Sequence, residues 1–199
     1  MSTPLILASA SSARQRMLQQ AGVAFCADPA AIDEGAIKTR LLASGMGPAS
    51  VAIALAEAKA MVVSARHPGA MVIGADQVLV CGDRLLDKPV DRDTAAGTLA
   101  LLRGRSHRLV SAVALVREAA VVWHYAEVAR LTMRAFSDSV LQRYLDAEGS
   151  AVTDTVGAYA VEARGLQLMA RIDGDHFTIL GLPLLPLLAQ LRRLGLAEA

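Results

Sequence analysis

The sequence predicts an α/β fold built around a mixed β-sheet. Short apolar runs typical of buried strands alternate along the chain with longer segments patterned as helices, which favours parallel strand pairing. In the middle of the chain, two Val-rich runs at residues 108–117 and 120–136 are separated by a short turn at Glu118. This arrangement is typical of a hairpin, and a hairpin adds antiparallel pairing to the sheet.

The first half of the chain contains five segments that we expect to be regular. They are a strand at 5–8, a helix at 13–22, a helix at 48–66, a strand at 71–80 and a helix at 94–104. Ser11 or Ser12 is expected to cap the first helix, which ends at Gly22. Pro48 and Asp93 are expected to begin the other two.

The second half continues the pattern after the hairpin. We expect a helix capped by Ser137 and closed by Gly149, then two strands joined by a turn at 173–174, then a final helix. The two strands are predicted at 166–172 and 177–181, and the last helix runs from Pro183 to Gly195.

The length and composition fit one globular domain spanning residues 1–199, with either one large core or two closely packed lobes. Hydrophobic residues make up 54% of the chain and charged residues 20%, and no repeat or linker interrupts it. The 20 Lys and Arg residues nearly balance the 19 Asp and Glu residues, which argues against non-specific nucleic-acid binding. The composition still allows a local cluster of Lys and Arg side chains around a small phosphorylated ligand.

The chain has the features of a cytoplasmic protein. Cys26 and Cys81 share no metal or redox spacing and are expected to be reduced thiols. The first residues lack the basic region of a signal peptide, and the apolar stretch at 181–191 is short and broken by prolines. We therefore expect no membrane segment.

Asp76 places a carboxylate inside a strand that is otherwise apolar. A buried, unpaired carboxylate is costly, so Asp76 needs a cation, a metal or strong hydrogen-bond donors. Either it caps a local bend, or it belongs to a functional site. Gly74 and Ala75 would let a substrate approach the backbone closely, which favours the functional interpretation.

The segment LASASSAR predicts an anion site where the first strand meets the first helix. Free N–H groups at a helix N-terminus attract anions, and Ser9, Ser11 and Arg14 add hydroxyls and a guanidinium suited to phosphate. The alternative is an ordinary capped helix with a solvated arginine.

Three further charged residues have two interpretations each. Lys59 lies in an apolar helical column, where it either extends to water or meets a phosphate at the helix edge. Asp33 and Glu34 are adjacent in a predicted loop, where they are either solvated or face another acid across a metal site.

A nucleobase site is suggested near the C-terminal third of the chain. Tyr159 and Phe177 are two of only six Phe and Tyr residues, and Glu162 could accept hydrogen bonds from a base edge. The alternative is that both aromatic rings belong to the core.

These segments, in this order, resemble the Maf family of nucleoside triphosphate pyrophosphatases. The resemblance covers nearly the whole chain, and its combined motifs are specific. They are LAS-x-S, E-A-K-A at residues 57–60, GAD followed by KP, GAY, and GD-x-F-x-x-x-GLP. The resemblance implies an elongated mixed sheet with flanking helices, two lobes around a central cleft, and often a homodimer.

The resemblance also implies hydrolysis of a nucleoside triphosphate to the monophosphate and pyrophosphate with a divalent cation, Mg²⁺ or Mn²⁺. Asp76 matches the family's proton acceptor, and Asp76 with Glu34 would serve the metal. Lys59 and Lys88 would neutralise phosphate charge. The positions expected to bind substrate are Ser9, Ser11, Ala13, Arg14, Gln77 and Glu162.

Several positions depart from the family pattern. Ser12 and Ala13 replace a proline and an arginine of the usual LAS-x-SPRR. Gln77 and Glu162 resemble the branch that hydrolyses 7-methyl-GTP, but that branch has Trp at position 13, and Thr155 replaces the family's lysine before AGAY. A 7-methyl-GTP-like substrate is the leading expectation. The alternatives are a dTTP/UTP pyrophosphatase and a nucleotide-binding regulator of cell division without hydrolysis.

Overall fold

The computed structural model describes residues 3–198, and the chain divides into two compact units. The first unit contains the chain up to Gln77, the segment Val110–Glu127, and the chain from Asp175 onward. The second unit contains Val78–Leu109 and Val128–Gly174. The N- and C-terminal parts of the sequence therefore belong to the same unit.

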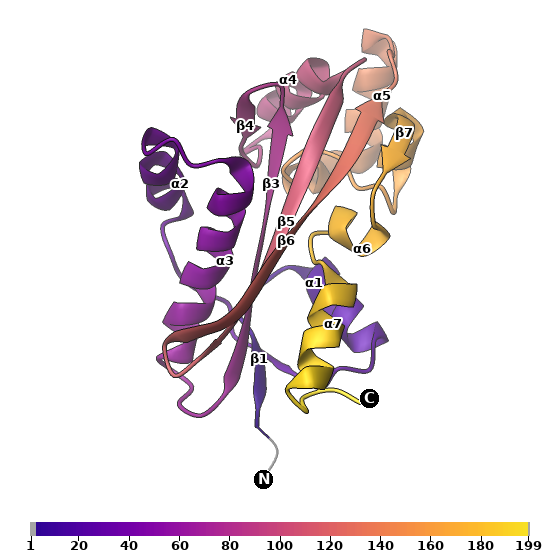
Figure 1. The fold of residues 1–199 in the computed structure, drawn as a ribbon. Coiled ribbons are helices and arrows are strands. Elements are labelled where there is room, and N and C mark those ends of the chain that lie inside the picture. The colour runs from indigo at the N-terminus through magenta and orange to yellow at the C-terminus, as the bar shows by residue number, and fades with distance from the viewer. Residues whose placement is uncertain (1–2, 199) are drawn as a thin grey trace. The chain divides into compact units, whose positions relative to one another are not determined.

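The described strands form one mixed sheet, as the sequence predicts (Figure 1). The order is β2-β1-β3-β5-β6-β7, with β4 pairing on β3. Strand β1 is parallel to β2 and β3, whereas β4 is antiparallel to β3 and β7 is antiparallel to β6. The strands are β1 Leu5–Leu7, β2 Cys26–Ala27, β3 Met71–Cys81, β4 Arg84–Leu86, β5 Ser106–Arg117, β6 Ala120–Met133 and β7 Met169–Asp173.

The predicted hairpin is the pair β5–β6, and its turn consists of Glu118 and Ala119. Both residues have a positive φ, 51° and 57°. Positive φ at both central residues is the geometry of a two-residue hairpin turn whose twist matches that of the strands.

Helices cover both faces of the sheet in the first unit. The helices of this unit are α1 Ser12–Gln20, α2 Glu34–Ala43, α3 Pro48–Ser64, α6 His176–Ile179 and α7 Leu184–Arg193. Alternate residues of β1 and β3 point to opposite faces. Leu5, Leu7 and Ile73 pack with residues of α1 and α7, whereas Ile6 and Val72 pack with α3. The burial of both faces explains why these strands are continuous apolar runs.

The helices of the second unit pack against one another. Its helices are α4 Arg92–Leu102, α5 Asp138–Glu148 and the 3₁₀ turns η1 Gly149–Thr153 and η2 Arg164–Leu168. Ser137 caps α5, as predicted, with its side chain accepting a hydrogen bond from the backbone of Val140. Among residues 3–198, no helix combines the length and apolar character needed to cross a bilayer.

Three local predictions are wrong. The cap of α4 is Asp91, not Asp93, because the Asp91 carboxylate accepts a hydrogen bond from Thr94 N at 2.7 Å. The predicted loop at Glu34 is the start of α2, capped by Asp33. The predicted strand at 177–181 is the short helix α6, because the Asp175 carboxylate accepts a hydrogen bond from Thr178 N and starts a helical turn.

Candidate active site

Lys59 joins two carboxylates in the first unit. Its Nζ atom lies 2.6 Å from Oδ1 of Asp76 on β3 and 2.8 Å from Oε1 of Glu34 on α2. The side chains of Lys59 and Asp76 are only 11% and 6% exposed, whereas that of Glu34 is 43% exposed. Lys59 therefore does not extend to water, and Asp76 has the cation that a buried carboxylate requires.

Gly74 explains how Lys59 reaches Asp76. A Cβ atom on Gly74 would lie 1.9 Å from the carbonyl oxygen of Ala56 and 2.9 Å from the Cβ of Ala60. The backbone of α3 thus packs directly on β3 at this point, two residues before Asp76. We expected a substrate to use the space at Gly74, and this expectation is wrong because α3 fills that space.

The second oxygen of Asp76 lacks a partner. Oδ2 is buried and forms no hydrogen bond with the residues that the structure describes. Buried oxygens without partners are rare in proteins, and they often mark a catalytic group or the place of a bound water or ion. This feature distinguishes Asp76 from a residue that caps a bend.

Asp33 and Glu34 have different roles although they are adjacent. The Asp33 carboxylate accepts a hydrogen bond from Ala36 N at 2.9 Å and caps α2. Burial opposes ionisation of Glu34, but the hydrogen bond and charge of Lys59, with the charges of Lys38 and Arg14, outweigh burial and lower its pKa. Glu34 is therefore held as a carboxylate beside Asp76.

Arg14 is anchored by the protein at the N-terminus of α1. Its Nε donates to the carbonyl oxygen of Gly181 at 2.8 Å, and one Nη atom donates to Ala75 O at 2.9 Å and Ser9 Oγ at 3.1 Å. Burial lowers its pKa from the ordinary value, against the opposing effect of the carboxylates of Asp76 and Glu34. Arg14 is therefore a fixed guanidinium, not a solvated one.

The two serines of the predicted anion site also make local hydrogen bonds. Ser9 is buried, and its Oγ accepts from Ser11 N at 3.3 Å as well as from Arg14. Ser11 Oγ accepts from Arg14 N at 3.4 Å and caps α1, which settles the choice between Ser11 and Ser12. Ala13 lies in the first turn of α1 and offers no polar group.

Gln77 points to the opposite face of β3 from Asp76 and is held by three oxygens. Its Nε2 atom lies 2.9 Å from Ser111 Oγ and 3.1 Å from each of the carbonyl oxygens of Thr178 and Ile179. Gly181, whose φ is +99°, brings Gln77 and Arg14 close, since a Cβ there would lie within 3.8 Å of both.

The site residues fit a divalent cation that shares its ligands with a substrate. No three His, Cys, Asp or Glu side chains among residues 3–198 gather as a metal cage. Magnesium-type ions, however, are often bound by one or two carboxylates plus substrate phosphates. Glu34 and Asp76 converge on one cation already, Lys59, and the unpartnered Asp76 Oδ2 is a free hard ligand.

Lys88 and Glu162 belong to the second unit. Lys88 is exposed and follows β4, and Glu162 is exposed in a turn before η2. The structure thus brings together Ser9, Ser11, Arg14, Glu34, Lys59, Asp76 and Gln77 within the first unit. The contributions of Lys88 and Glu162 stay predictions.

The expected aromatic face for a nucleobase is wrong. Tyr159 is 6% exposed, and its hydroxyl lies 2.6 Å from Nε2 of His107 inside the second unit. Burial raises the pKa of Tyr159. Phe177 packs against the core cluster of the first unit. Tyr159 is therefore a core residue, and Phe177 is half-buried against the core.

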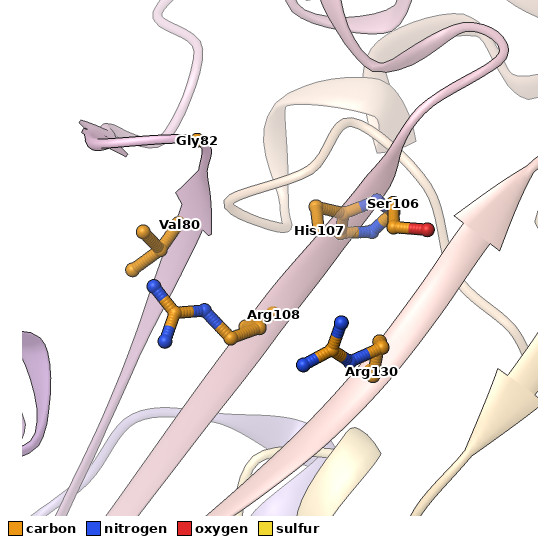
Figure 2. A pocket seen from close by; sticks show the side chains of 6 residues that line it. All are labelled: Val80, Gly82, Ser106, His107, Arg108 and Arg130. Carbon is orange, nitrogen blue, oxygen red and sulfur yellow. The ribbon is translucent and has the colours of Figure 1, made fainter.

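The second unit contains a hollow that the sequence did not indicate (Figure 2). Its volume is about 250 Å³, and its lining residues are Val80, Gly82, Ser106, His107, Arg108 and Arg130. Arg108 extends from β5 and Arg130 from β6, and none of the described residues that line the hollow carries a carboxylate. This lining suits an anionic group better than a metal ion. Strand alternation alone could not identify it, because exposed arginines are common on sheets.

Comparison with known proteins identifies the family. The model of the family described as Maf-like protein matches residues 4–194. A nucleoside triphosphate pyrophosphatase of Paramagnetospirillum magneticum is 55% identical over 96% of this chain and 98% of its own. A 7-methyl-GTP pyrophosphatase of Rhizobium meliloti is 51% identical over 98% of both chains. With the mixed sheet and the Asp76–Lys59–Glu34 group already described, these matches show that the chain belongs to the Maf family.

Proposed function

We propose that this protein hydrolyses a nucleoside triphosphate to the monophosphate and pyrophosphate. The proposal depends mainly on the buried carboxylate of Asp76, which has one oxygen on Lys59 and the other without a partner among residues 3–198. The names of its relatives, nucleoside triphosphate pyrophosphatase and 7-methyl-GTP pyrophosphatase, support the same reaction.

In the proposed reaction, a water molecule attacks the α-phosphorus. Asp76 Oδ2 accepts the proton of that water, the bond between the α-phosphorus and the bridging oxygen breaks, and its electron pair leaves with pyrophosphate. Lys59 fixes Oδ1 and so orients the base. Preorganised positive groups stabilise the charge that moves to the leaving group, and this is the role that we assign to Lys59, Arg14 and Lys88.

Arg14 is suited to a phosphate because only part of its guanidinium is used by the protein. Within residues 3–198, its Nη2 atom donates none of the hydrogen bonds that hold the side chain. The other nitrogens fix the plane of the group. A fixed plane favours recognition of phosphate oxygens in one orientation. Ser9 and Ser11, at the start of the same helix, belong to this phosphate site.

Glu34 would be the direct ligand of the divalent cation, with Mg²⁺ or Mn²⁺ as the candidates. Asp76 would contribute its negative charge to the same metal site, because its Oδ2 atom is assigned to the proton. When bound, such an ion neutralises phosphate charge and lowers the pKa of a coordinated water. Lys59 keeps both carboxylates in place and limits their mutual repulsion.

The base is recognised, in this proposal, by Gln77, Ala13 and Glu162. Gln77 and Glu162 favour a purine with hydrogen-bond donors, and a 7-methyl-GTP-like substrate leads. Ala13 cannot stack on a methylated, cationic purine, so recognition of such a base would depend on hydrogen bonds. The second candidate is a relaxed preference that includes dTTP and UTP. Position 13 has Ala in place of both the arginine of the usual family pattern and the Trp of the 7-methyl-GTP branch, so neither side chain restricts the base there.

The test is pyrophosphate release from a panel of triphosphates with Mg²⁺ or Mn²⁺, including 7-methyl-GTP, GTP, dTTP and UTP. The wild-type protein should turn over at least one of them, and Asp76→Asn should lose at least about 10²-fold in turnover. Asp33→Asn is the matched control, since it removes the same charge from a helix cap and should retain activity. Nucleotide binding without turnover by the wild type would favour the regulator, and full activity in Asp76→Asn would remove Asp76 as the base.

A further inference from the structure

The orientation of the Gln77 amide follows from its neighbours. Its Nε2 lies within 3.1 Å of the backbone carbonyls of Thr178 and Ile179, and a carbonyl oxygen can only accept a hydrogen bond. The third neighbour, Ser111 Oγ, donates its own hydrogen to Thr178 O at 2.7 Å and so also accepts from Gln77. Turning the amide over would place its oxygen against two carbonyl oxygens.

The Gln77 oxygen is consequently available to a ligand. Among the described residues, Oε1 accepts no hydrogen bond, and it is not one of the buried polar atoms without a partner. Gln77 is half-buried, and Oε1 is therefore a polar atom that is neither bonded within the described residues nor completely buried. It lies beside Gly181, which also contacts the guanidinium of Arg14.

From this geometry we propose that Gln77 acts only as a hydrogen-bond acceptor, and that the Ser111, Thr178 and Ile179 oxygens are positioning groups that impose this role. The ligand class follows: a nucleobase whose pairing edge presents an N–H donor to Gln77. This inference rests on the proposed function, because it assumes that a nucleotide base lies at Gln77. It adds which atom recognises the base and what holds that atom in place.

Further contacts keep the positioning group rigid. Thr178 is fully buried, and its hydroxyl donates to Glu127 Oε2 at 2.6 Å. Its backbone N–H donates to Asp175 Oδ1 at 2.9 Å, which holds the first turn of α6. Because these bonds fix the Thr178 and Ile179 carbonyls, the Gln77 amide cannot adapt to a ligand that presents an acceptor.

The first experiment pairs changes in ligand and protein. We would measure the dissociation constants of three nucleotides with Ca²⁺, for the wild type and for Gln77→Met. The nucleotides are GTP, ITP, which lacks the 2-amino donor, and N1-methyl-GTP, which lacks the N1–H donor. In the wild type, one of the two analogues should bind about three- to tenfold more weakly than GTP. In Gln77→Met, GTP should bind more weakly and that difference should vanish.

A second variant tests the orientation itself. Gln77→Glu places a carboxylate against the Thr178 and Ile179 carbonyls, so GTP binding relative to wild type should weaken by about tenfold at pH 8. At low pH a protonated glutamic acid can donate to those carbonyls and present its other oxygen outward. The affinity relative to wild type should therefore recover as the pH falls, whereas Gln77→Met should show no such recovery.

A change at Ser111 completes the test. Ser111→Ala should reduce the discrimination between GTP and the weaker analogue, and Ser111→Thr should restore it. Ser64→Ala is the matched control, since Ser64 is also buried but bonds to the backbone of Ala119. Three results would each overturn the inference. The wild type and Gln77→Met could discriminate equally between GTP and the analogues, or the affinity of Gln77→Glu for GTP could fail to recover at low pH. The third is that none of the three nucleotides binds detectably. Failure of the proposed reaction is seen separately, as absent turnover by the wild type.

Discussion

The Nζ atom of Lys59 lies 2.6 Å from Oδ1 of Asp76, in a part of the first unit where both side chains are almost completely buried. The sequence separation of the two residues is 17, and they come from a helix and a strand that touch at Gly74. A buried ion pair is costly to break, because the partner left behind remains desolvated.

Lys59→Met should therefore destabilise the protein by about 3 kcal/mol, since it leaves Asp76 buried without its cation. Urea unfolding of both proteins measures this difference. The double variant Lys59→Met with Asp76→Leu should be less destabilised than the sum of the two single variants, because no buried charge is left unpaired. Simple additivity would show that the two side chains do not depend on each other for stability.

Gly74→Ala should cost at least about 3 kcal/mol and reduce turnover, since the new methyl group would overlap with the backbone of α3. A shift of α3 also moves Lys59 away from Asp76. Gly97→Ala in α4 is the matched control, because a Cβ atom there meets nothing within 4 Å. That change should be neutral or stabilise by up to about 1 kcal/mol, as alanine favours a helix interior. Similar effects of both changes on urea unfolding would contradict the close packing at Gly74.

Removal of metal should abolish turnover without unfolding the protein. Lys59 bonds to both Glu34 and Asp76 and offsets one of their two negative charges, so the protein itself supplies part of the counter-charge that holds the fold at this point. Addition of EDTA should eliminate pyrophosphate release while the melting temperature changes by less than about 2 °C, and excess Mg²⁺ should restore activity. Glu34→Gln should raise the Mg²⁺ concentration needed for half-maximal activity. A large fall in melting temperature with EDTA would identify a structural metal instead.

His107 should make the stability depend on pH. Burial lowers its pKa from 6.5 to about 4, partly opposed by the backbone of Arg105. Between these values the unfolded chain binds a proton that the folded chain does not, so the contribution of His107 to stability is complete above pH 6.5 and is lost as the pH decreases to 4. The shift corresponds to about 3 kcal/mol at most.

Unfolding experiments with His107→Gln check this expectation. The variant should lose less stability than the wild type between pH 7 and pH 4.5, and the exposed His176 supplies the control substitution His176→Gln. An identical pH dependence in wild type and His107→Gln would show that His107 does not titrate differently on unfolding.

Much of the candidate site was predictable because its side chains conflict with their apolar surroundings. A carboxylate inside a strand and a lysine inside an apolar helical column each need a partner, and Asp76 and Lys59 are partners of each other. The hairpin and most helix ends were predictable as well, because turns and caps depend on neighbouring residues.

The other parts of the fold and of the candidate site depend on the positions of backbone atoms, which the sequence of side chains does not reveal. The carbonyls of Ala56, Thr178 and Ile179 determine the packing at Gly74 and the orientation of Gln77. Thr178 and Ile179 are β-branched, a residue type that favours strands, yet the capping carboxylate of Asp175 starts a helical turn there, and α6 forms where the sequence predicts a strand. Long-range pairs such as His107 with Tyr159 were also beyond reach, since nothing local relates them.

The interleaving of the two units has a consequence for the order of folding during translation. All residues of the second unit have been synthesised once the chain reaches Gly174, whereas the first unit still lacks the segment that begins at Asp175. Because domains generally fold as units while they are made, the second unit can form first. The carbonyls that hold Gln77 and Arg14 are synthesised only after the whole of the second unit. A nascent chain therefore contains Asp76 long before the candidate site is complete, and chains that lack the segment after Gly174 should be inert.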